Sequence, residues 1–210
     1  MEVKKNIAVL GGGAAGFFAA ISAKTHHPEA EVILFEKTSN VLAKVKVSGG
    51  GRCNVTNGNT DINSLCLAYP RGGKKLKKIL HQFSTQDTKT WFEKRGVPLK
   101  TEADQRVFPV SNQSQSIIDC LMEAIEKLGV KLKHSSHIKS LTQRDEKWIL
   151  QFNVDKKYES FDAVIVATGG SPKLKSFDWL KNLGHKIIPP VPSLFTFNMP
   201  KEPITALMGI

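Results

Sequence analysis

The pattern of apolar and polar positions predicts a strand, a helix and a second strand at the start of the chain. Asn6–Leu10 and Glu31–Glu36 are short runs rich in apolar strand formers. Between them, apolar residues at helical spacing predict a helix from about Ala14 to His26, which stops before Pro28. This order is typical of a parallel βαβ unit, so the sequence predicts an α/β fold.

Further helices are expected in the middle of the chain. Apolar residues spaced over Leu76–Phe83 predict one helix, and the capping signal Ser84–Asp87 predicts the start of another. A third has an apolar face from Ile117 to Leu128. We expect Arg106–Ser111 to be a short edge strand or loop, because Pro109 cannot donate a hydrogen bond in a central ladder.

The apolar period changes to two in the later part of the chain. Val130–Lys133 is predicted to extend the parallel sheet. His137–Gln143, Lys147–Val154 and the stretch after Lys157 predict an antiparallel meander. Phe161–Gly170 is then expected to form a near-continuous apolar strand, buried on both faces, that ends in a glycine turn. The predicted fold therefore combines a parallel central sheet, an antiparallel meander and inserted helices.

The last segments suggest where domains begin and end. Lys173–Leu183 predicts a final helix, and Leu194–Phe197 predicts one more strand after a proline-rich stretch. We expect residues 1–190 to form one domain with a helical insertion at about 60–110. Residues 191–210 would begin a substrate domain that is otherwise missing, so the chain is expected to be a fragment.

The turn between the first strand and the first helix has the spacing of a dinucleotide site. In this motif Gly11 permits a tight turn, Gly13 lets the backbone approach a pyrophosphate, and Gly16 lets the helix pack on the sheet. The first-turn amides and the helix dipole then face the phosphates. Glu36, twenty residues after Gly16, can accept hydrogen bonds from a ribose 2′-OH and disfavours a 2′-phosphate.

A second glycine-rich loop follows the second strand. Three consecutive glycines, Gly49–Gly51, precede Arg52 and cannot form the interior of a stable helix or strand. Successive amides in such a loop can form an anion-binding nest with the arginine as charge partner. A flexible linker is the alternative, but the following Arg-Cys-Asn-Val-Thr-Asn is not linker composition.

Charge raises the question of a nucleic-acid partner. The 210 residues hold 30 Lys and Arg against 19 Asp and Glu, a net charge of +11. The lysines are scattered apart from a cluster at Lys74–Lys78, and no aromatic residue interleaves with that cluster. We therefore expect a solvated helix face and no nucleic-acid partner.

Composition also bears on membranes, metals and compartment. No apolar run approaches the roughly 18–20 residues of a membrane span. The amino-terminal residues run directly into a predicted strand, so we expect no signal peptide. Cys53, Cys66 and Cys120 lack metal-ligand spacing and form an odd set. We expect no metal, no membrane partner and a cytoplasmic location.

The order of motifs resembles a known family. A nucleotide motif at the start, an acid closing the second strand, a glycine-rich Arg-Cys-Asn loop, a meander and a late Ala-Thr-Gly-Gly turn are similar to the two-dinucleotide-binding-domain flavoproteins. More narrowly, Ser48–Asn57, Arg106–Ser111 and the segment from Gly184 to Leu194 resemble the bacterial NAD(P)/FAD-dependent oxidoreductases. That group includes aminoacetone oxidase and a bile-acid dienone reductase. The residues before Lys44, Val41-Leu-Ala, depart from the glycine usual there.

The resemblance implies a Rossmann-like FAD-binding domain, a small-molecule substrate, and NAD(P)H as a candidate transient co-substrate. It also implies that the family continues for about as many residues again. The implied contacts to the FAD pyrophosphate, ribose and adenine are Gly11, Gly13, Ala14, Ala15, Gly16, Glu36, Lys37, His137, Ile138, Ala167, Thr168 and Gly169. Those along the flavin side are Lys44, Ser48, Gly50, Gly51, Arg52, Cys53 and Asn54.

Function is predicted in these terms. The leading hypothesis is a flavin-dependent oxidoreductase in which Arg52 and the Gly49–Gly51 amides stabilise negative charge on reduced flavin. The sequence identifies no catalytic acid or base and assigns no oligomeric state. An NAD-dependent dehydrogenase without flavin is one alternative. A non-catalytic nucleotide- or nucleic-acid-binding module is the other.

Overall fold

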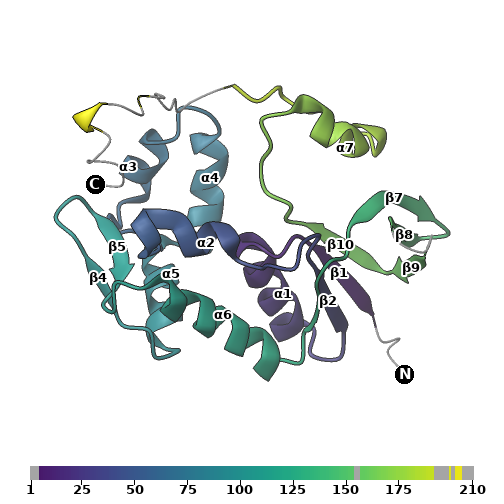
Figure 1. Cartoon of the computed structure of the whole chain (residues 1–210), viewed down its shortest axis with the longest axis horizontal. Coiled ribbons are helices and arrows are strands. Elements are labelled where there is room, and N and C mark those ends of the chain that lie inside the picture. Colours follow the sequence, from purple (N-terminus) through teal and green to yellow (C-terminus); the bar gives the residue numbers. More distant parts are fainter. Residues whose placement is uncertain (1–4, 154–156, 192–198, 200–201, 205–210) are drawn as a thin grey trace. The chain divides into compact units, whose positions relative to one another are not determined.

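The chain folds into two compact units. The computed structural model describes residues 5–153, 157–191, 199 and 202–204. One unit comprises Met1–Leu42 with Ala124–Ile210, and the other comprises Ala43–Glu123. We call these the nucleotide unit and the insertion unit and describe each separately; Figure 1 shows their elements. Helix α6, Ser114–Lys127, crosses the chain boundary between them. The domain limits expected from the sequence stay predictions.

A four-stranded parallel sheet forms the centre of the nucleotide unit. Its order is β10-β1-β2-β6, and every pairing in it is parallel. The bounds are β1 Asn6–Leu10, β2 Glu31–Phe35, β6 Lys131–Lys133 and β10 Ala163–Val166, with helix α1, Ala14–His26, between β1 and β2. These elements confirm the predicted βαβ unit and the Rossmann-like fold class.

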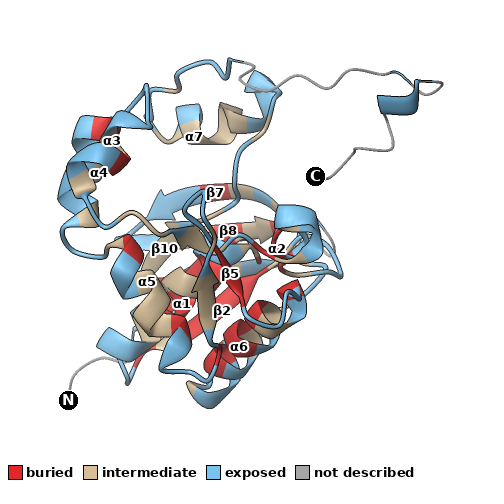
Figure 2. Cartoon of the chain, turned by 90° about the vertical axis from the view of Figure 1, so that its left-hand side faces the viewer, coloured by how far each residue is buried: buried red, intermediate tan, exposed pale blue. Residues whose placement is uncertain are grey.

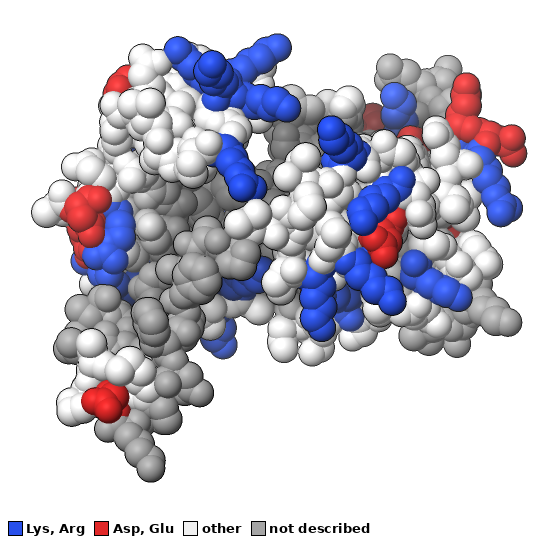
Figure 3. Space-filling model, turned by 90° about the horizontal axis from the view of Figure 1, so that it is seen from above, with Lys and Arg blue, Asp and Glu red and all other residues white. Residues whose placement is uncertain are grey.

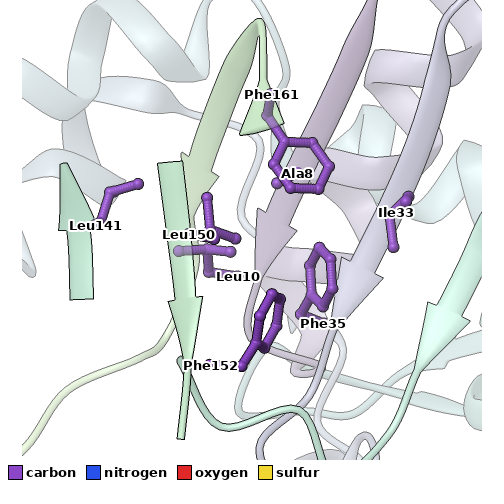
Figure 4. Close-up of a cluster of buried hydrophobic side chains, with 8 residues drawn as sticks. All are labelled: Ala8, Leu10, Ile33, Phe35, Leu141, Leu150, Phe152 and Phe161. Carbon is purple, nitrogen blue, oxygen red and sulfur yellow. The ribbon is translucent and has the colours of Figure 1, made fainter. Parts of the chain in front are cut away.

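An antiparallel meander packs against this sheet. Its strands, in the order β7-β8-β9, are Ile138–Arg144, Lys147–Phe152 and Tyr158–Phe161. The hydrophobic cluster of Figure 4 joins the meander to the parallel sheet. In it the Phe35 ring lies 5.4 Å from the Phe152 ring and meets Phe161 edge-on at 5.8 Å. The cluster members are Ala8, Leu10, Ile33, Phe35, Leu141, Leu150, Phe152 and Phe161. Because strand side chains alternate between faces, Ala8 and Leu10 point into this cluster.

The insertion unit contains short helices and a small antiparallel sheet. The sheet has the order β3-β5-β4, with bounds Thr56–Asn57, Arg106–Pro109 and Leu99–Thr101. Its helices are α2 Ala43–Val47, α3 Ile62–Leu67, α4 Gly73–Leu80 and α5 Thr85–Glu93, with a 3₁₀ turn at Ser48–Gly51. Ser84 caps α5 through the predicted capping box with Asp87. Figure 2 shows that α3 and α4 are largely exposed.

The expectation of one doubly buried strand at Phe161–Gly170 was wrong. The chain forms two strands, β9 and β10, that belong to different sheets and are separated at Asp162. The Asp162 carboxylate accepts a hydrogen bond of 2.8 Å from the Asn6 amide and pairs with Lys147. Because β10 lies at the edge of the described sheet, its residues are only partly buried or exposed.

Two other expectations also need correction. Arg106–Ser111 was expected at an edge or in a loop, but β5 is the central strand of its sheet. Pro109 is tolerated because it is the last residue of the strand. The predicted helix Lys173–Leu183 is shorter, with a 3₁₀ turn at Leu174–Phe177 followed by α7, Asp178–Asn182. The predicted strand Leu194–Phe197 lies outside the described residues.

Candidate functional site

Packing within the protein explains two glycines of the first turn. Gly11 has φ +114°, and a Cβ placed on it would lie 2.4 Å from the Ala167 carbonyl oxygen. A Cβ on Gly16 would lie 1.8 Å from the Gly11 carbonyl oxygen. Any side chain at either position would therefore push the turn apart. The predicted roles of these two glycines, a tight turn and close packing, match this geometry.

Gly13 differs because no protein atom approaches the side-chain position. It is the N-cap of α1, with φ −92° and ψ −177°, and no side chain caps the helix. A Cβ built there would meet nothing within 4 Å, and the next residues, Ala14 and Ala15, are exposed. The helix start thus presents its amides and positive dipole end to open space, which fits an anionic pyrophosphate.

The carboxylate of Glu36 lies against this turn. Its Oε2 accepts a 2.8 Å hydrogen bond from the Gly12 amide, and its Oε1 accepts bonds of 2.9 Å from both the amide and hydroxyl of Thr38. Burial raises the pKa of Glu36, but the hydrogen bonds outweigh burial, so its net pKa lies below the ordinary value. Glu36 is therefore an anion near neutral pH, and Oε2, which accepts one hydrogen bond here, can accept another.

The other predicted residues of the nucleotide unit gather around the same sheet edge. The Ala167 amide donates to the Leu10 carbonyl at 2.8 Å, which brings the late glycine turn beside Gly11. The Ser136 amide donates to the Glu36 carbonyl at 2.8 Å, which brings the start of the meander beside the end of β2. Carboxyl ends of parallel strands are where α/β sheets bind ligands.

Several individual placements follow from these contacts. Lys37 directly follows Glu36 and is exposed. His137 is exposed, with Nδ1 2.7 Å from the Asn153 amide nitrogen, while Ile138 is partly buried against the hydrophobic cluster. Thr168 and Gly169 are exposed beyond β10, and Gly169 has φ +73°. Their roles as cofactor contacts stay predictions.

The second glycine loop belongs to the insertion unit and forms a left-handed turn. Gly49, Gly50 and Gly51 have φ of +56°, +65° and +84°, and Cys53 has φ +62°. The Cys53 amide donates to the Ser48 carbonyl at 2.9 Å and closes the turn. Three consecutive positive φ angles favour glycine strongly, which explains the run of glycines that sequence patterns could only exclude from helices and strands.

The side chains of the loop and of the helix before it differ in burial and in hydrogen bonding. Cys53 is buried, and this burial raises the pKa of its thiol despite a hydrogen bond from Ser48, so a packed thiol fits better than a reactive thiolate. Asn54 is exposed, and its Oδ1 accepts a 3.3 Å hydrogen bond from the Val107 amide. Lys44 is exposed on α2.

Arg52 has protein partners that the sequence did not predict. Its Nη1 donates to Glu102 Oε1 at 2.8 Å, and its guanidinium stacks over the Phe108 ring at 3.9 Å. Glu102 lies fifty residues away in sequence, so no local spacing signals the pair. Gly12 and Thr38, which hold Glu36, were also missed. The only sequence signal for Gly12 was that it stands between two motif glycines.

A pocket of about 360 Å³ opens beside the second loop, within the insertion unit. It combines amide and hydroxyl side chains with an apolar wall formed by Leu65, Tyr69 and Leu80. The remaining lining residues are Asn54, Val55, Thr56, Asn57 and Thr85. Because no charged side chain lines it, the pocket suits an uncharged part of a ligand.

In the described part of the chain we looked for a metal-binding cluster and for a membrane-spanning helix. No group of three or more His, Cys, Asp and Glu residues there is arranged to hold a metal ion. None of the helices in that part is both long and apolar enough to span a bilayer.

Comparison with known families decides the classification. Residues 5–201 match the family described as HI0933-like protein Rossmann domain. This chain belongs to that family. Among curated relatives, the 3-dehydro-bile acid delta(4,6)-reductase of Clostridium scindens is 28% identical over 97% of the chain and 50% of its own length. The ribosomal RNA dihydrouridine synthase of Haemophilus influenzae is 27% identical over 100% of the chain and 53% of its own length.

Solved structures show the same fold at low sequence identity. A 3-ketosteroid-delta4-(5alpha)-dehydrogenase from Rhodococcus jostii, solved with 4-androstene-3,17-dione, has a TM-score of 0.61 and 18% identity over 84% of this chain and 48% of its own. The quinol fumarate reductase of Escherichia coli has a TM-score of 0.59 and 15% identity over 81% of this chain and 33% of its own. The chain spans about half the length of the curated relatives it matches.

Proposed function

We propose that the chain is the FAD-binding part of a flavoprotein oxidoreductase that acts on a small-molecule substrate. Gly13 carries the proposal: the helix start is open where a pyrophosphate would lie, while Gly11 and Gly16 are fixed by packing. Family membership and the curated relative with a reductase name support FAD as the cofactor. Bound FAD would supply the electron-transfer chemistry, with NAD(P)H as a transient partner.

In this proposal the protein residues bind and orient the cofactor. The first-turn amides of α1 would hold the pyrophosphate, and Glu36, an anion at neutral pH, would accept hydrogen bonds from the ribose. The left-handed loop Ser48–Asn54 would lie along the flavin and present the Arg52 charge. The cytoplasmic location expected from the sequence is part of this proposal.

Spectroscopy tests the proposal directly. Purified protein should show the absorbance of bound flavin. If it is purified without cofactor, it should quench the fluorescence of added FAD in a saturable titration that gives a dissociation constant. Titration with NAD in place of FAD distinguishes the dehydrogenase alternative. Colourless protein that fails to bind added FAD would refute the proposed function, and saturable NAD binding in its place would favour the dehydrogenase.

A second candidate substrate class is RNA, and one observation favours it. Arg71 and four lysines of α4 carry five positive charges within eight residues. All five side chains are exposed, and Figure 3 draws more basic than acidic side chains in its view. The four lysines are Lys74, Lys75, Lys77 and Lys78. Two relatives are ribosomal RNA dihydrouridine synthases.

The dependence of RNA affinity on salt concentration distinguishes an RNA substrate from the sequence-based expectation of no nucleic-acid partner. Replacing the four α4 lysines with glutamine should reduce the slope of log affinity against log salt by about 3 for single-stranded RNA. A matched control replaces exposed lysines elsewhere, namely Lys94, Lys139, Lys175 and Lys186. Equal slopes for the two variants would remove the RNA candidate.

A further inference from the structure

The carboxylate of Glu102 lies between two arginines at a tight hairpin. Oε1 accepts the 2.8 Å hydrogen bond from Arg52, and Oε2 lies 3.8 Å from Arg106 Nη2. The hairpin backbone fixes Glu102, because its amide donates to the Arg106 carbonyl at 2.8 Å and its carbonyl accepts from the Gln105 amide at 2.9 Å. The carboxylate therefore has a defined position in the small sheet of the insertion unit.

The ring of Phe108 joins this hairpin to the glycine loop. It is fully buried, stacks under the Arg52 guanidinium at 3.9 Å, and lies 2.8 Å from the position a Cβ would take on Gly49. Arg52 Nε also donates to the Gly49 carbonyl at 3.4 Å. One arginine thus contacts the ring, the carboxylate and the loop backbone, so its charge is held in one place relative to the loop.

This position matters because Arg52 is the single arginine of the loop predicted to lie along the flavin. A positive charge beside a flavin favours the reduced form, which carries more negative charge than the oxidised form. The exposed fractions of the Arg52 and Glu102 side chains are only 32% and 29%, so water screens the pair incompletely. Glu102 therefore decides where the Arg52 charge is held.

We propose that Glu102 is a positioning residue that sets the redox balance of bound flavin through Arg52. It holds the guanidinium against Phe108 and so keeps the arginine charge back from the flavin. This inference rests on the proposed function. Its test uses only protein that has first been shown to bind FAD, so failure of wild-type binding refutes the proposed function, whereas the outcomes below concern Glu102.

The experiment compares the affinities for reduced and oxidised FAD in Glu102→Gln and in matched variants. Glu102→Gln keeps the side-chain shape and removes the charge. We expect the ratio of reduced to oxidised affinity to rise about tenfold, which is about 30 mV for a two-electron couple. Glu102→Asp keeps the charge and its attraction to Arg52, so it should stay within about twofold of wild type. Asp104→Asn removes a charge from the same hairpin that pairs with Arg106 rather than Arg52, and should also leave the ratio unchanged.

A double variant tests whether the effect passes through Arg52. In an Arg52→Gln background, the further change Glu102→Gln should alter the affinity ratio by less than about twofold. A tenfold effect in that background, or an equal effect of Asp104→Asn, would overturn the proposal. An unchanged ratio in Glu102→Gln would overturn it as well. A lowered unfolding midpoint in Glu102→Gln, with no return to the wild-type ratio in Glu102→Asp, would show a purely structural role and would also overturn it.

Discussion

Replacement of Gly13 by alanine should weaken FAD binding without weakening the fold. A Cβ at Gly13 meets no protein atom within 4 Å, and the backbone there, with φ −92°, suits any residue. Alanine is a poorer N-cap than glycine, but it also lowers the entropy of the unfolded chain, so we expect a net change within about 0.5 kcal/mol. The unfolding midpoint in urea should therefore match that of wild type.

The cofactor should respond differently because the new methyl group would lie where we propose that the pyrophosphate approaches the helix start. Displacing the phosphates lengthens their hydrogen bonds to the first-turn amides, and we expect the dissociation constant of FAD to rise at least about tenfold, or about 1.4 kcal/mol. Gly16→Ala provides the contrast. Its Cβ would lie 1.8 Å from the Gly11 carbonyl oxygen, so that variant should lose about 3 kcal/mol of stability.

The assay is fluorescence titration with FAD, paired with urea unfolding of the protein without cofactor. Gly170→Ala is the matched control, since its added methyl group would also meet nothing within 4 Å and Gly170 is outside the predicted contacts. Wild-type FAD affinity in Gly13→Ala would refute the placement of the pyrophosphate. Equal weakening by Gly170→Ala would show that the methyl group acts through something other than that contact.

Two further predictions concern ionisable groups. Glu36 has a folded pKa below its ordinary 4.5, so its stabilising effect is complete above pH 4.5 and is lost as the pH falls through the lowered pKa. The urea unfolding midpoints of wild type and Glu36→Gln should therefore converge on acidification to about pH 3. A gap between the two midpoints that stays constant with pH would contradict this prediction. Burial raises the pKa of the Cys53 thiol. A thiol reagent at mild alkaline pH should therefore modify the partly exposed Cys66 in a fast phase, and the buried Cys53 and Cys120 only on unfolding. Loss of that fast phase in Cys53→Ala would contradict this prediction.

The nucleotide motif was predictable because its signals are local. Gly11, Gly13, Gly16 and Glu36 lie within one βαβ unit, and the strand and helix between them have regular apolar periods. The structure adds a difference among the three glycines. Two are fixed by protein packing and only Gly13 is left open, a distinction that spacing alone cannot make.

The errors arose where a run of apolar residues passes between sheets. Phe161 and Val164 belong to different sheets although both stand in one apolar stretch, because Asp162 binds the Asn6 amide and ends the meander. Periodicity reports that residues are apolar, and it does not report which sheet they join. For Pro109 the rule used was sound, but the strand is so short that its last residue needs no donor.

Leu42 shows how the chain accommodates a strained backbone beside the glycine turn. It adopts φ +55°, and its side chain is 1% exposed. A left-handed conformation costs a non-glycine residue about 1–2 kcal/mol, whereas burying a leucine side chain gains about 1.5–3 kcal/mol. The Leu42 amide also donates to the Gly12 carbonyl at 2.8 Å. Gly12 in turn donates to Glu36. Burial of the Leu42 side chain therefore offsets the backbone strain. Through its amide, Leu42 also connects the chain that leaves β2 to the glycine turn and to Glu36, on which the proposed nucleotide site depends.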